Sequence, residues 1–143
     1  MAPSHVLVPL DGSPLADDAL EEALELFDCR VTVLNVVTPI DAKMAESGVL
    51  KPDKEDRESA RERADGLIER ARARADEVDQ SVETAVETGD PAETILGYVD
   101  DHDVDRVVMG SHGGERSAIA RRLLGTVATT VVGKAPVTVT VVR

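Results

Sequence analysis

The sequence predicts a single α/β domain, residues 1–143, with a doubly wound, five-stranded parallel sheet that carries helices on both faces. Strand-like and helix-like segments alternate along the chain, and short connections between them are typical of parallel sheets. The segment 30–37, Arg-Val-Thr-Val-Leu-Asn-Val-Val, is rich in β-branched residues and almost continuously apolar, as expected for a strand covered on both faces. A length of 143 residues and a hydrophobic content of 42% suffice for one core.

The first strand and its helix are predicted from residues 5–10 and the corner that follows them. The run His-Val-Leu-Val-Pro-Leu has the length of a strand, and Asp11 with Gly12 supplies a turn. Ser13 is expected to cap the next helix, and Pro14 to occupy its first position. The apolar residues of this helix recur at spacings of three and four and form one stripe: Leu15, Ala16, Ala19, Leu20, Ala23, Leu24 and Phe27.

The remaining segments continue the alternation. Residues 53–79 predict a long helix, whose mixed charges we interpret as a solvated face. Residues 81–87 alternate in polarity with a period of two, which indicates a strand at the sheet edge. The last elements are a helix that begins at Pro91, a buried strand at 105–109, a helix from about Thr126 and a strand at 137–142.

The composition disfavours several classes of partner. A formal net charge of −12 argues against contact with nucleic acid or an anionic membrane surface, and one Phe, one Tyr and no Trp leave few side chains for base stacking. No apolar run approaches the roughly 20 residues that span a bilayer, and no secretory signal is visible, so we expect a cytoplasmic protein. The only cysteine, Cys29, allows no intrachain disulfide. The excess of acidic residues also suits a halophilic source.

Two glycine-rich corners indicate a phosphate site. Gly110 and Gly113 follow the buried strand at 105–109, and Gly125 directly precedes the next helix. Glycine lets backbone N–H groups come close to a ligand, and the first N–H groups of a helix form an anion site. Ser111 and Thr126 would add hydroxyl donors.

The local charge supports the same placement. Residues 110–143 contain one acidic residue against five basic ones, so this region is +4 by count in an acidic chain. The corners match neither a Walker A loop nor the dinucleotide motif G-x-G-x-x-G after the first strand. The residues therefore point to an anionic ligand without naming it.

Four short motifs include these corners and extend toward both ends of the chain. They are Val6-Leu7-Val8-Pro9-Leu10-Asp11-Gly12-Ser13, Val107-Val108-Met109-Gly110-Ser111-His112-Gly113, Leu124-Gly125-Thr126-Val127-Ala128 and Ala135-Pro136-Val137. Together they resemble the universal stress protein family over essentially the whole chain. ATP-binding members carry G-x2-G-x9-G-[ST], whereas eleven residues separate Gly113 from Gly125 here. The two additional residues either lengthen the loop and leave the site unchanged, or they move the phosphate end of the site.

The resemblance implies a fold like that of the adenine nucleotide α-hydrolases, with the strand order 3-2-1-4-5. In such a sheet a ligand lies at the carboxyl ends of strands 1 and 4, where the connections reverse. The resemblance also implies that the ligand is ATP, and leaves open whether Mg²⁺ accompanies it. The implied contacts are Pro9, Leu10 and Asp11 at the ribose, Val36 and Met109 at adenine, and Gly110, His112, Gly113, Gly125, Thr126, Val127 and Ala128 at the ribose and phosphates.

The implied function is that of an ATP-binding stress-response protein acting as a nucleotide-dependent sensor or regulator. No residues resemble a dedicated hydrolytic apparatus, so we assign no catalytic residue and expect slow ATP hydrolysis at most. A dimeric stress scaffold that binds no nucleotide and an ATP α-hydrolase or adenylating enzyme are the alternatives. The resemblance further implies a homodimer joined through the last strand, Val137 to Val142; a monomer whose edge is guarded by Arg143 is the alternative.

Several polar residues have a structural interpretation beside the functional one. Asp11 would be a ribose or metal-bridging carboxylate, or only the turn residue of its corner. His112 would contact a ligand, or only the backbone. His5 and His102 lack Cys or His partners at metal-ligand spacing, which favours structural or surface roles and no metal site. Cys29 is interpreted as a small apolar residue.

Overall fold

The computed structural model describes residues 3–38, 54–112 and 124–143, with the backbone alone described for 54–57. Strands and helices alternate along these residues. In chain order they are β1 (His5–Pro9), α1 (Pro14–Leu26), β2 (Arg30–Val37), α3 (Lys54–Glu77), β3 (Glu83–Thr88), α4 (Pro91–Asp101), β4 (Arg106–Gly110), α5 (Thr126–Lys134) and β5 (Thr138–Val142).

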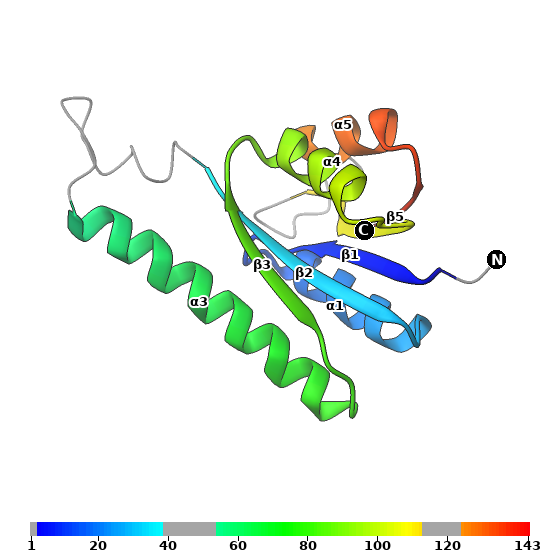
Figure 1. Ribbon diagram of the computed structural model, residues 1–143, viewed down its shortest axis with the longest axis horizontal. Helices are drawn as coiled ribbons and strands as arrows, with labels where there is room; N and C mark the ends of the chain where they lie inside the picture. The colour runs from blue at the N-terminus through cyan, green and yellow to red at the C-terminus, as the bar shows by residue number, and fades with distance from the viewer. Residues whose placement is uncertain (1–2, 39–53, 113–123) are drawn as a thin grey trace.

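The five strands form one sheet in the order β3-β2-β1-β4-β5, and every neighbouring pair is parallel. Figure 1 shows α1 and α3 on one side of this sheet and α4 and α5 on the other. The doubly wound fold, the strand order and the edge position of β3 are therefore confirmed. The connection after β1 leads to β2 on one side, and the connection after β4 leads to β5 on the other side. The carboxyl ends of β1 and β4 therefore border a crevice.

Local sequence signals explain where α1 and α4 begin. The Ser13 hydroxyl accepts a hydrogen bond of 3.3 Å from the Ala16 N–H, and the Asp90 carboxylate accepts one of 3.0 Å from the Glu93 N–H. A proline follows each cap at the start of the helix. Because these caps satisfy orphan N–H groups within one turn, a few neighbouring residues suffice to start each helix.

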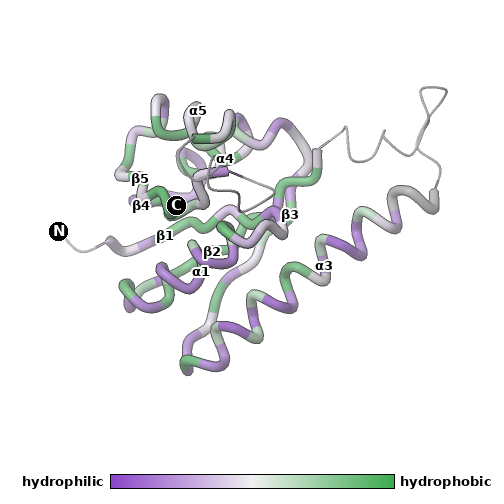
Figure 2. The backbone as a smooth tube through the Cα atoms, turned by 180° about the vertical axis from the view of Figure 1, so that it is seen from behind, coloured by the Kyte–Doolittle hydropathy of each residue, from purple (hydrophilic) through white to green (hydrophobic). Residues whose placement is uncertain are grey.

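The core is aliphatic and has one part on each face of the sheet. Alternate residues of β1 supply both parts: Val6 and Val8 pack with α1 and α3, whereas Leu7 packs with α4 and α5. Figure 2 shows that hydrophilic residues dominate α3. Its few buried residues, among them Ile68 and Ala71, join the core on the α1 side. Within the described residues, no helix is both long enough and apolar enough to cross a membrane.

His5, His102 and Cys29 are not among the described residues that line the cavity at the crevice. His5 is 3% exposed, and its ring nitrogens lie 3.0 Å from the His102 carbonyl oxygen and 2.8 Å from Thr32 Oγ1. The His102 ring stacks on Tyr98 with a centroid separation of 3.8 Å. Cys29 packs against the core on the α1 side. Burial, with smaller effects from two nearby carboxylates, raises the pKa of its thiol, which disfavours a reactive thiolate.

Asp105 ties the start of β1 to the start of β4. Its carboxylate accepts hydrogen bonds from the Ser4 N–H (2.8 Å), the Ser4 hydroxyl (2.7 Å) and the His5 N–H (3.2 Å). Burial alone would raise the pKa of Asp105, but these hydrogen bonds outweigh it and hold the pKa below its ordinary value. The ionised carboxylate therefore stabilises the folded chain.

We expect the Asp105→Asn substitution to lower the free energy of unfolding at pH 7 and to have a smaller effect at acidic pH. A carboxylate whose folded pKa is depressed contributes stability above its unfolded pKa of about 3.9 and loses that contribution as pH falls through the folded pKa. Urea unfolding between pH 7 and pH 2 measures the difference. Asp101→Asn, at the exposed end of α4, is the control. An Asp105→Asn effect independent of pH would contradict the prediction.

Candidate functional site

A cavity of about 900 Å³ opens at the carboxyl ends of the central strands. It is bordered by the ends of β1, β2 and β4, by α1 and α3 on one side, and by α4 and α5 on the other. Its size lies in the upper part of the range for small-molecule sites, about 300–1,000 Å³. Eleven predicted site residues line it: Pro9, Leu10, Asp11, Val36, Met109, Gly110, His112, Gly125, Thr126, Val127 and Ala128. The twelfth, Gly113, lies outside the described residues.

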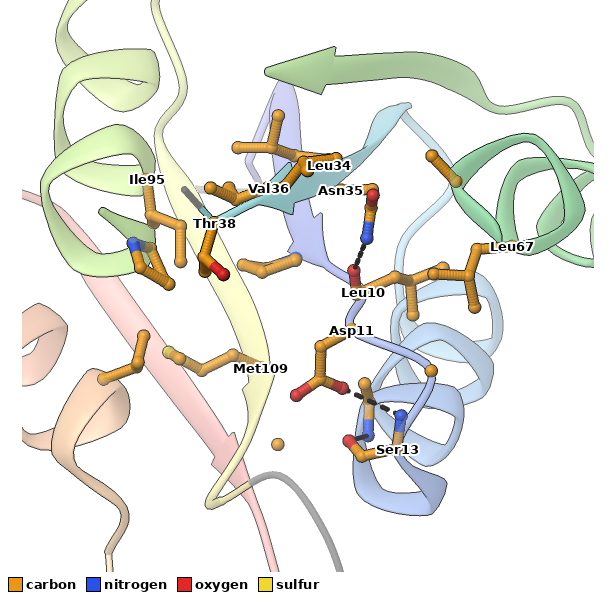
Figure 3. A pocket seen from close by; sticks show the side chains of 18 of the residues that line it. Leu10, Asp11, Ser13, Leu34, Asn35, Val36, Thr38, Leu67, Ile95 and Met109 are labelled. Carbon is orange, nitrogen blue, oxygen red and sulfur yellow. Dashed lines mark hydrogen bonds between the residues drawn. The ribbon is translucent and has the colours of Figure 1, made fainter. Parts of the chain in front are cut away.

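The corner between β1 and α1 forms one wall of the cavity. Gly12 has φ +86°, a conformation that favours glycine, and it turns the chain between Asp11 and the Ser13 cap. The Ser13 N–H donates a hydrogen bond of 2.8 Å to Asp11 Oδ1. In Figure 3 the other carboxylate oxygen of Asp11 faces the open middle of the cavity. Asp11 therefore has the predicted turn role, and its charge also reaches the cavity.

Asn35 positions this corner, although it was not selected from the sequence. Its side chain is 6% exposed and donates a hydrogen bond of 2.8 Å to the Leu10 carbonyl oxygen. The Leu10 N–H in turn donates to the Leu34 carbonyl oxygen at 2.9 Å. These two bonds fix the chain beyond the end of β1 against β2. The single amide side chain in a strand of mostly apolar residues was the signal for this buried role.

The corner between β4 and α5 forms the opposite wall. The Gly125 N–H donates a hydrogen bond of 2.7 Å to the Ser111 carbonyl oxygen, and the Ser111 N–H donates one of 2.8 Å to the Val142 carbonyl oxygen. A Cβ atom on Gly125 would lie 3.0 Å from His112 Cβ, so the two segments approach closely. Gly125 begins α5 without a side-chain cap. The first N–H groups of α5 therefore lie at the cavity without a side-chain cap.

Ser111, which was predicted as a hydroxyl donor to the ligand, is fully buried. It is 0% exposed and is not among the described residues that line the cavity, whereas Gly110 and His112 on either side of it are. Its Oγ atom is buried and has no hydrogen-bond partner among the described residues. Thr126, the other predicted hydroxyl, is exposed at the cavity.

An apolar wall lies between the two corners. Val36 at the end of β2 and Met109 in β4 both line the cavity, as predicted for an adenine site. Ile95 of α4, which was not selected from the sequence, lies near them in Figure 3. Apolar side chains beside a few polar groups suit a ligand that combines a base with charged groups.

Helix α3 contributes to the cavity, although its charges were interpreted only as a solvated face. Leu67 approaches the β1 corner, and a Cβ atom on Gly12 would lie 3.3 Å from Leu67 Cδ2. Arg63 and Arg70, which lie on the same face of α3, also line the cavity. All three were missed from the sequence because their role depends on where α3 packs.

The model of the universal stress protein family matches residues 3–143. The chain belongs to this family. Among solved structures it is similar to universal stress protein UspA from Lactobacillus plantarum, at 27% identity and a TM-score of 0.80, covering 100% of this chain and 99% of that chain. No curated protein sequence matches this universal stress protein significantly.

Two more distant universal stress proteins share the fold. A family member from Arabidopsis thaliana with AMP bound is 23% identical, with a TM-score of 0.70 over 98% of this chain and 91% of that chain. The universal stress protein from Archaeoglobus fulgidus in complex with dAMP is 21% identical, with a TM-score of 0.68 over 100% of both chains. The family fold is therefore kept at low sequence identity.

The glycine spacing of this universal stress protein differs from the family pattern in a segment outside the described residues. The eleven residues between Gly113 and Gly125 fall almost entirely within 113–123. On either side of that segment, His112 and Gly125 lie next to each other at the cavity. The longer spacing therefore leaves the start of α5 beside the end of β4.

Proposed function

We propose that this universal stress protein binds an adenine nucleotide, ATP, in the cavity at the carboxyl ends of β1 and β4 and acts as a nucleotide-dependent sensor or regulator. The observation that carries the proposal is that eleven of the residues implied by the family resemblance line one cavity of about 900 Å³. Two universal stress proteins of the same fold have AMP or dAMP bound, which supports an adenine nucleotide as the ligand class.

Each part of the nucleotide has a chemically suitable wall. Adenine would lie against the apolar side chains of Val36 and Met109, and the ribose would lie beside Pro9, Leu10 and Asp11. A carboxylate accepts hydrogen bonds from ribose hydroxyls. The ribose and the phosphates would meet the uncapped start of α5 and the glycine-rich corner: Gly110, His112, Gly113, Gly125, Thr126, Val127 and Ala128.

The proposal includes little or no hydrolysis. Rapid phosphoryl transfer needs a group that positions the attacking water and cations that neutralise the leaving phosphates. Asp11 is the only carboxylate among the described residues that line the cavity. If Asp11 contacts the ribose, it does not also position a water at the terminal phosphate. An accompanying Mg²⁺ ion would take phosphate oxygens and waters as most of its ligands.

Calorimetric titration with ATP, with and without Mg²⁺ and at both low and molar salt, tests the proposal. We expect saturable binding with little turnover, and mass analysis is expected to detect nucleotide retained through purification. GTP is the control ligand, because a base site formed by Val36 and Met109 is expected to discriminate through the edge groups of the base. Absence of nucleotide binding at either salt would favour the dimeric scaffold.

We also propose that two copies of the chain pair through β5. This strand lies at the end of the sheet with β4 on one side only, and an unpaired strand edge favours pairing with another chain. We expect a dimer by light scattering. Val141→Lys would place two like charges at a symmetric interface and raise the dimer dissociation constant about a hundredfold. Val132→Lys, on the exposed face of α5, is the control. A monomeric wild-type chain would contradict the prediction.

A further inference from the structure

The cavity has two ends, and the proposed nucleotide contacts account for only one of them. The α5 end has the uncapped helix start and the glycine-rich corner. The α3 end lies on the opposite side of the strand termini, in the helical layer formed by α1 and α3. It is lined by small or apolar residues together with two cations: Ala60, Arg63, Ala64, Gly66, Leu67 and Arg70.

The two arginines at the α3 end differ from every other arginine of that helix. Neither Arg63 nor Arg70 has an acidic residue three or four positions away in the sequence. The other arginines of α3 each have at least one such neighbour: Arg57, Arg61, Arg72 and Arg74. Since side chains at these spacings are neighbours on a helix, the pattern leaves uncompensated charge only at the cavity.

Tertiary contacts among the described residues do not supply the missing partners. Arg74 pairs with Asp17 and Glu21 of α1, and Arg72 donates a hydrogen bond of 3.0 Å to Thr84 Oγ1. For Arg63 and Arg70, no ion pair or hydrogen bond to any described residue is present. Both side chains remain exposed at the cavity.

The described lining of the cavity carries a charge opposite to that of the chain. The described lining residues include these two arginines and one carboxylate, Asp11, whereas the whole chain carries a formal charge of −12. In an acidic protein, a cavity with excess positive charge concentrates anions. Arginine in particular suits phosphate, because its planar guanidinium donates two parallel hydrogen bonds.

We propose that Arg63 and Arg70 form a second anion-binding subsite at the α3 end of the cavity, which takes a phosphate-type group separate from the phosphate held at the α5 end. The subsite rests on the proposed function, since the nucleotide occupies the rest of the cavity. The phosphate-type group is either the terminal phosphate of the nucleotide itself or a separate phosphate compound. A cavity of about 900 Å³ has room for more than a nucleoside monophosphate.

The test compares two double variants that remove the same charge from the same helix. Arg63→Gln with Arg70→Gln removes the subsite. Arg61→Gln with Arg72→Gln is the matched control, because neither of those arginines lines the cavity in the described structure. Calorimetry at constant ionic strength gives the affinities for ATP, for AMP, and for inorganic pyrophosphate with AMP present. Circular dichroism checks that both variants keep the fold.

We expect the cavity variant to bind ATP about tenfold more weakly and AMP with unchanged affinity, with the control variant like wild type. This result would assign the subsite to the terminal phosphates of the nucleotide. Unchanged nucleotide affinities with a roughly tenfold loss of pyrophosphate binding would assign it to a separate phosphate compound.

Three results would overturn the subsite: equal losses for ATP and AMP, equal losses in the control variant, or no loss for any probe. Failure of the proposed function gives a different pattern. In that case wild type would bind pyrophosphate through Arg63 and Arg70 in the absence of AMP, while binding no nucleotide.

Discussion

Replacing Gly110 with valine should lower the free energy of unfolding by about 3 kcal/mol. A Cβ atom at Gly110 would lie 2.9 Å from both the carbonyl carbon and Cβ of Leu15, and 3.0 Å from the Ala16 nitrogen. Two of these atoms belong to the backbone of α1, so no side-chain rotation can relieve the contact. Either α1 or β4 must move, and both pack in the core. Urea unfolding of the ligand-free chain measures the loss.

Gly97→Ala is the matched control for this prediction. Gly97 lies within α4, and a Cβ atom there has nothing within 4 Å. Because alanine is the better helix former, this substitution is expected to raise the free energy of unfolding by up to about 1 kcal/mol. Wild-type stability of Gly110→Val would show that α1 and β4 do not approach so closely. The predicted destabilisation also makes Gly110 a poor position at which to test ligand binding alone.

The Asp11→Ala substitution is expected to weaken adenine nucleotide binding about tenfold, the value of one hydrogen bond to a charged group. One carboxylate oxygen accepts the Ser13 N–H at 2.8 Å, and the other faces the cavity where the ribose is proposed to lie. Alanine removes both interactions at once. Titration of AMP into wild type and variant measures the change in the dissociation constant.

The Asp11→Asn variant separates the two roles of this residue. Its side-chain carbonyl can still accept the Ser13 N–H, so the corner is kept while the negative charge is lost. Weaker binding by both variants would assign the effect to the charge, whereas a loss confined to Asp11→Ala would assign it to the turn. Wild-type affinity of Asp11→Ala would remove Asp11 from the proposed ribose site.

Much of the fold was predictable because its signals are local. A cap and a proline, Ser13 with Pro14 and Asp90 with Pro91, start α1 and α4 within a few residues of sequence. The segment 30–37 was predicted as a strand covered on both faces, and the structure has β2 at the same residues with most of them buried. Strand ends were less well predicted: the first strand ends at Pro9 rather than Leu10, and β3 begins at Glu83 rather than Ser81.

The prediction for Ser111 depended on packing that its local sequence does not show. Ser111 was predicted as a ligand donor from its place in the glycine-rich corner, but it is 0% exposed and does not line the described cavity, whereas Gly110 and His112 do. The local sequence of the glycine-rich corner does not reveal which of its side chains face a ligand. Only the packing of β4 beside β5 and α5 determines that.

The sequence by itself was enough to find the family motifs and to predict the two corners that border the cavity. Each corner is built from consecutive residues whose turn and cap chemistry is local. The tertiary structure alone decided that Asn35, Arg63 and Arg70 belong to the same cavity. Asn35 acts through a carbonyl 25 positions earlier in the chain. The arginines reach the cavity because Ile68 and Ala71 seat α3 in the core beside α1. Contacts between segments far apart in sequence depend on packing, and no local pattern specifies them.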